Sequence, residues 1–68
     1  MKLSARNLLK GKILSVAKDQ TTTHARIDIG GGAVVTSSIT DEALHDLALK
    51  DGDDTTSVIK ASAVMIAK

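Results

Sequence analysis

The sequence predicts an all-β fold, a small barrel of the oligonucleotide-binding (OB) type with five short strands and one short helix. Three observations support this prediction. Short stretches rich in β-branched residues alternate between apolar and polar positions. Turns rich in Gly or Asp separate several of them. One stretch has the spacing of a helix instead. An open β-sandwich is the lesser alternative.

The first half of the chain predicts three strands. Lys12–Val16 is β-branched and alternating, and Thr21–Ile29 alternates more clearly. In the second stretch one face carries Ala25, Ile27 and Ile29, and the other carries His24, Arg26 and Asp28. Gly30–Gly32 predicts a turn because Gly tolerates positive φ, so Ala33–Ile39 completes a hairpin.

The second half predicts a helix and two strands. Thr40 or Asp41 is a suitable N-cap, and acidic residues in the first turn favour the helix dipole. Apolar residues then share one helical face as far as Leu47. The remaining elements are a turn at Lys50–Asp53 and strands at Thr55–Lys60 and Val64–Ala67.

Length and composition predict one domain, residues 1–68, that associates with copies of itself. A domain this short buries little surface and usually needs disulfides, a metal or oligomerisation. Cys is absent, and the two histidines have no metal-ligand spacing. Aromatic residues are also absent, so the core must consist of smaller aliphatic side chains.

The charge and hydropathy patterns predict a cytoplasmic protein. The net charge of +1, from nine basic and eight acidic residues, is too balanced for a general nucleic-acid or membrane surface. No apolar run is long enough to span a bilayer, and the first residues lack the apolar segment of a signal peptide. We therefore expect neither nucleic acid nor membrane as a partner.

No pattern in the sequence predicts catalysis. The acids Asp51, Asp53 and Asp54 surround a Gly turn, where carboxylates are normally solvated. His24 and His45 are expected at the surface. The run of three Gly residues lacks the spacing of a phosphate-binding loop. We expect no enzyme activity and no catalytic residues.

Two polar segments near the chain ends are candidates for an anion site. They are Ser4, Arg6 and Asn7 near the start, and Lys60, Ala61 and Ser62 near the end. An anion needs positive charge, hydroxyl donors and free backbone N–H groups, and both segments supply these. Arg6 offers a planar fork of donors, while Lys60 offers a point charge. Taken alone, such segments are usually ordinary surface.

The same segments closely resemble a known family. Members of this family begin with a segment like Met1–Asn7 followed by Leu9-Lys10-Gly11. They continue with a hairpin like Ile27–Gly32, and they end with a segment like Val58–Ser62 followed by Val64-Met65. The middle, Ser38-Ile39-Thr40 before a short helix, and Leu49–Asp53 also match. This is the pattern of molbindins, small molybdate-binding proteins built from one Mop domain of the TOBE, OB-like superfamily.

The resemblance implies a ligand, an assembly and a set of site residues. The ligand is molybdate or tungstate, without a separate cofactor, held at subunit interfaces for storage or buffering. The assembly is a homo-oligomer, typically a hexamer built as a trimer of dimers. Carried over by position, the anion-contacting residues are Ser4, Arg6, Thr40, Lys60 and Ala61, with Ser62 next in the motif.

Two segments depart from the family pattern. Asp19–Thr23 replaces a stretch that often contains Gly and Asn, so additional anion sites there are not carried over. Thr55 stands where an apolar strand residue is common, which predicts a softer barrel. Two alternative functions are a small nucleic-acid-binding barrel, which lacks aromatic stacking residues here, and a regulatory interaction module.

Overall fold

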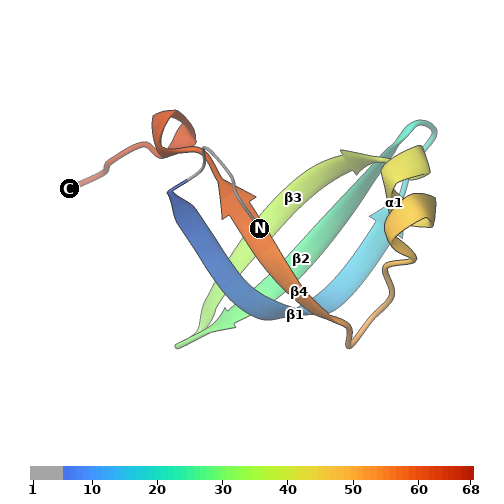
Figure 1. The fold of residues 1–68 in the computed structure, drawn as a ribbon, viewed down its shortest axis with the longest axis horizontal. Coiled ribbons are helices and arrows are strands. Elements are labelled where there is room, and N and C mark those ends of the chain that lie inside the picture. Colours follow the sequence, from blue (N-terminus) through green and yellow to red (C-terminus); the bar gives the residue numbers. More distant parts are fainter. Residues whose placement is uncertain (1–5) are drawn as a thin grey trace.

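A computed structural model describes residues 6–68 as one curled antiparallel sheet with a short helix at one end (Figure 1). The four strands lie in the order β3-β2-β1-β4. Their bounds, with those of the helix α1 and the 3₁₀ turn η1, are β1 Asn7–Lys18, β2 Thr22–Gly30, β3 Ala33–Thr40, α1 Asp41–Leu47, β4 Asp54–Ile59 and η1 Ala61–Ala63.

The core lies on the concave face of the sheet. Ile13, Ala25 and Ile27 are buried there, and Val16, Ile29 and Val35 pack against them. Burial alternates along β2 as its sequence predicts, with His24, Arg26 and Asp28 exposed. The aliphatic core is small, so many large apolar side chains stay exposed, among them Leu8, Leu14, Val58 and Met65.

The long strand β1 bends in order to pair with two partners. It pairs with β2 and with β4, so that Lys12 lies opposite both Asp28 and Asp54. The register with β2 shifts between Ile13 and Ser15, an irregularity that increases the bend. A Cβ atom at Gly11 would lie 2.4 Å from the carbonyl oxygen of Asp28. Glycine therefore permits the close approach of the β1 and β2 backbones.

The helix α1 closes the end of the sheet where β2 begins and β3 ends. The Thr40 hydroxyl accepts a hydrogen bond from the Ala43 N–H at 3.0 Å, as an N-cap should. The hydroxyl of Thr23, the most completely buried side chain of the described residues, donates to Asp41 Oδ1 at 2.7 Å. The helix ends at Ala48, which has a φ of +51°.

The structure confirms the all-β class, the Gly-rich hairpin and the helix, and it corrects two elements. The first strand begins at Asn7 instead of Lys12. The predicted fifth strand, Val64–Ala67, is wrong: this segment follows η1 without regular structure and leads away from the sheet (Figure 1). A strand needs a neighbouring edge for its backbone groups, and the segment finds none within residues 6–68. Residues 6–68 therefore contain four strands.

Replacing Gly11 with Ala tests the close approach of β1 and β2. The added methyl group displaces the Asp28 carbonyl, so we expect the free energy of unfolding to fall by about 2–3 kcal/mol. Gly31→Ala is the control, because it adds only left-handed strain at a φ of +63°, with open space around it and a cost of about 1 kcal/mol. Urea unfolding at one fixed protein concentration measures both variants. Equal losses would contradict the steric explanation.

Candidate functional site

Arg6 and Lys60, two of the predicted anion-binding residues, lie next to the paired residues Asn7 and Ile59 at one end of the sheet. Asn7 at the start of β1 lies opposite Ile59 at the end of β4, and the Asn7 side-chain amide donates to the Ile59 carbonyl at 3.2 Å. Arg6 directly precedes this pair and Lys60 directly follows it. Both side chains are exposed. Segments more than fifty residues apart in sequence thus place two positive charges at the same end of the sheet.

The backbone after Lys60 turns sharply and adds further donors. The Ala63 N–H donates to the Lys60 carbonyl at 2.9 Å, and the Val64 N–H donates to the Ala61 carbonyl at 3.2 Å. These bonds form η1, in which the first N–H groups have no acceptor inside the turn. Those N–H groups belong to Ala61 and Ser62, and the Ser62 side chain is exposed. The structure therefore brings Arg6, Lys60, Ala61 and Ser62 to one end of the sheet.

Thr40, another of the predicted residues, does not join this cluster. Thr40 lies at the end of β3 opposite Thr22, where β2 begins, which is the far end of the sheet from Asn7. Its hydroxyl oxygen already accepts the capping hydrogen bond. Ser4 lies outside the described residues 6–68.

Basic and acidic residues lie in separate parts of the sequence, although the net charge is only +1. Residues 1–18 and 55–68 contain seven of the nine basic residues and no acid, whereas residues 19–54 contain all eight acids. The described parts of the first two segments form β1, most of β4 and η1, so they bring the positive charges of Arg6 and Lys60, and no acid of their own, to one end of the sheet. Counting charge by segment, instead of over the whole chain, reveals this segregation from sequence alone, but only the pairing of β1 with β4 brings Arg6 and Lys60 to the same end.

The positive charge of Lys12 is already compensated. Its ammonium group donates to Asp54 Oδ1 at 2.7 Å on the exposed surface. This hydrogen bond and the attraction between the charges raise the pKa of Lys12 and lower the pKa of Asp54. Arg6 and Lys60 take part in no ion pair among residues 6–68. They are therefore better placed than Lys12 to neutralise a bound anion.

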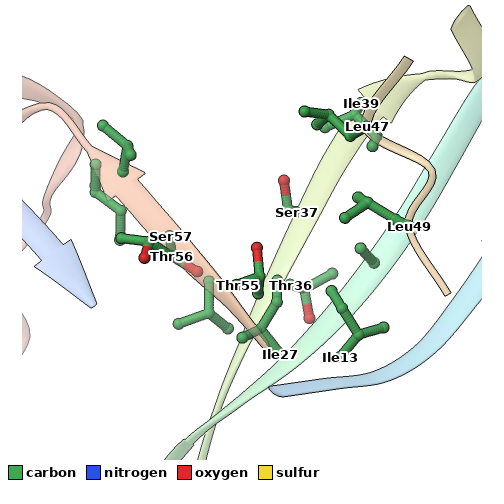
Figure 2. Close-up of a pocket in the computed structure, with 14 residues that line it drawn as sticks. Ile13, Ile27, Thr36, Ser37, Ile39, Leu47, Leu49, Thr55, Thr56 and Ser57 are labelled. Atoms are coloured by element: carbon green, nitrogen blue, oxygen red, sulfur yellow. The ribbon is translucent and has the colours of Figure 1, made fainter. Parts of the chain in front are cut away.

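A groove of about 380 Å³ runs between the edge strands β3 and β4, which are not paired with each other (Figure 2). Its floor is apolar and includes Ile13 and Ile27. Hydroxyl groups from both edges also line it, and Ser57 Oγ is buried there without a hydrogen-bond partner among the described residues. None of the predicted anion-binding residues that the structure describes lines this groove. The groove is therefore a separate surface. It combines an apolar floor with a buried hydroxyl group that has no hydrogen-bond partner among the described residues.

The groups at the basic end offer positive charge and hydrogen-bond donors, the combination that binds oxyanions most strongly. Within residues 6–68, no three His, Cys, Asp or Glu side chains gather in a way that could hold a metal ion. Both histidines are exposed, as the sequence predicts. No helix in that range is both long and apolar enough to cross a membrane.

Comparisons with known proteins agree on one family. The TOBE domain family matches residues 3–66. Molybdenum-pterin-binding protein 3 of Clostridium pasteurianum is 46% identical over 66 residues, which are 97% of each chain. A molybdate-binding protein from Sporomusa ovata has a TM-score of 0.93 with 29% identity and full coverage of both chains. A cytoplasmic molybdate-binding protein solved with molybdate bound has a TM-score of 0.91 with 37% identity, covering 96% of this chain and 46% of that one.

The sequence match and the structural match both extend over nearly the whole chain. The relatives are described by what they bind and not by a reaction. The chain therefore belongs to the TOBE domain family, among the small molybdenum-pterin-binding and molybdate-binding proteins.

Proposed function

We propose that this protein reversibly binds molybdate, or the similar tungstate, between its subunits and acts as a cytoplasmic store or buffer without catalysing a reaction. The observation that carries the proposal is that Arg6 and Lys60 lie at the same end of the sheet, beside the first N–H groups of η1, which have no acceptor among residues 6–68. Relatives described as molybdate-binding, one of them cytoplasmic, support the choice of ligand and location.

The charge of the site suits a dianion. A doubly charged oxyanion loses hydration when it is enclosed, so the protein must supply compensating charge and hydrogen bonds. Arg6 and Lys60 together supply two positive charges, and backbone N–H and hydroxyl groups supply further donors. No cofactor is needed for such binding, and the described groups at this end, Arg6, Lys60 and Ser62, are proposed to hold the anion and not to react with it.

An anion held by one subunit would remain exposed to water. Arg6, Lys60 and Ser62 are all exposed in the single chain, and Thr40 lies at the far end of the sheet. Contact with another copy encloses the basic end and lets residues from two subunits share one anion. We include Ser4 and Thr40 in the proposed site on this basis.

The structure also offers a mode of self-association. The edges of β3 and β4 expose unpaired backbone groups on either side of the apolar groove. Beyond η1, the side chains of Val64, Met65 and Ile66 are 48%, 92% and 89% exposed. We propose that this segment of one copy lies in the groove of another as a fifth strand. A hexamer built as a trimer of dimers is the proposed final assembly.

Self-association of this kind couples assembly to anion binding. The exposed segment follows directly after Lys60–Ser62, so its insertion into a neighbour places that motif at a boundary between subunits. A ligand that binds only the assembled form stabilises it by mass action. Molybdate should therefore favour the oligomer, and dilution should weaken the binding of molybdate.

Removing either charge tests the site. We expect Arg6→Ala and Lys60→Ala each to weaken molybdate binding by about 10- to 100-fold, because each removes charge-assisted hydrogen bonds of about 1.5–3 kcal/mol. Calorimetric titration with molybdate measures the affinity, with sulfate as the control ligand. Lys18→Ala is the matched control, since Lys18 is an exposed basic residue at the other end of β1. Unchanged affinity in both site variants would refute the assignment.

Changing the exposed segment tests the assembly. In Ile66→Asp a carboxylate enters the apolar groove, so we expect the oligomer to dissociate at concentrations where the wild type stays assembled. Lys68→Asp, which changes charge two residues further on, should keep the assembly. Sedimentation velocity gives the mass of each species. An oligomer of unchanged stability in Ile66→Asp would show that the segment does not occupy the groove.

A further inference from the structure

Ser57 carries the one polar side-chain atom of residues 6–68 that is buried without a hydrogen-bond partner. The residue lies on β4, at the groove between β4 and β3, and its backbone is paired with Leu9 of β1. Buried hydroxyl groups normally have a partner, because removing one from water without a partner is unfavourable. The exception at Ser57 therefore requires a physical explanation.

The described residues around the groove do not supply that partner. Ser37 on β3 and Thr55 on β4 also line the groove (Figure 2), yet neither forms a hydrogen bond with the Ser57 hydroxyl. In the proposed assembly, the segment Val64–Ala67 of another copy enters the gap between β3 and β4. The side chains of this segment contain no oxygen or nitrogen atom. Its strong hydrogen-bond acceptors are therefore its backbone carbonyl groups.

We propose that the Ser57 hydroxyl donates a hydrogen bond to a backbone carbonyl of the inserted Val64–Ala67 segment and thereby fixes the register of that segment in the groove. The inference rests on the insertion described under the proposed function, and it adds the residue that positions the inserted strand. Ser57 is a positioning residue, because it contacts the neighbouring subunit and not the anion.

The inserted segment needs such a contact because its own side chains do not specify a register. A slip of one residue turns every side chain of a strand to the opposite face, which is unfavourable when one face is polar. Val64–Ala67 is apolar at every position, so either face is compatible with the apolar floor of the groove. A slip also moves the carbonyl group that faces β4 by about 3.3 Å. The Ser57 hydroxyl then loses its acceptor, so one register is favoured.

The register of the segment also determines where the anion-binding motif lies. Only Ala63 separates Ser62 from the start of the segment. A slip in the groove would therefore displace Lys60–Ser62 relative to the neighbouring subunit. Ser57 thus links the groove to the proposed anion site through the position of the chain.

Ser57→Ala in the full-length protein tests the hydrogen bond. The rate of subunit exchange is measured by native mass spectrometry after isotope-labelled and unlabelled oligomers are mixed at one fixed molybdate concentration. We expect exchange to be about tenfold or more faster in Ser57→Ala, because the variant leaves a buried carbonyl group unpaired. Ser38→Ala is the matched control, since Ser38 is an exposed serine of β3 that does not line the groove. It should exchange at the wild-type rate.

Nuclear magnetic resonance of the same proteins tests the register. The amide groups of Val64–Ala67 should give one set of signals in the wild type and in Ser38→Ala. In Ser57→Ala they should give more than one set, because more than one register is then populated.

A second background separates positioning from a role within the subunit. Ile66→Asp is expected to keep subunits apart, so the Ser57 hydroxyl has no partner in that variant. Adding Ser57→Ala to it should leave the free energy of unfolding unchanged or raise it, as urea unfolding measures. A clear loss would overturn the inference, because the hydroxyl would then act within its own chain.

The remaining outcomes distinguish the inference from the proposed function. An unchanged exchange rate in Ser57→Ala, or a single set of segment signals, would overturn the inference and leave the proposed function intact. An Ile66→Asp variant that stays assembled would overturn the insertion and the inference with it. A wild type that is monomeric and binds no molybdate would overturn both the proposed function and the inference.

Discussion

The pairing of β1 with β2 along one edge and with β4 along the other is the constraint on which the rest of the structure depends. It requires a long, bent strand that approaches β2 closely, and Gly11 permits that approach because the Asp28 carbonyl occupies the space of a Cβ atom. The same pairing joins the start of β1 to the end of β4, which places Arg6 beside Lys60. A backbone constraint in the core therefore determines the geometry of a charged site at the surface.

The small size of the sheet explains its open groove. Three buried aliphatic side chains form the centre of the core, and no aromatic side chain is available to fill the space between β3 and β4. Two strand edges remain beside an apolar surface, together with the buried Ser57 hydroxyl, which has no hydrogen-bond partner among residues 6–68. Such edges are stable when another strand covers them. The proposed self-association would supply contacts that a chain of 68 residues is too short to provide by itself.

Local patterns predicted local structure well. Alternation identified both faces of β2, the Gly run identified the hairpin, and the cap at Thr40 identified the helix. The fifth strand was wrong because the composition of Val64–Ala67 indicates an extended segment but not the sheet in which its backbone would pair. The meeting of Arg6 and Lys60 depends on pairing across the whole chain, so no local pattern predicts it without the family resemblance.

Charge segregation gives the proposed assembly its dependence on the ligand. Residues 1–18 and 55–68 carry no acid, so copies that bring these ends together also bring positive charges together. Repulsion disfavours the empty interface, whereas a dianion between the subunits replaces it with attraction. In the proposed assembly, the charges assigned to anion binding are thus the charges that oppose assembly without the anion. A neutral interface of the same shape would associate whether or not the anion was present, and would give no such coupling.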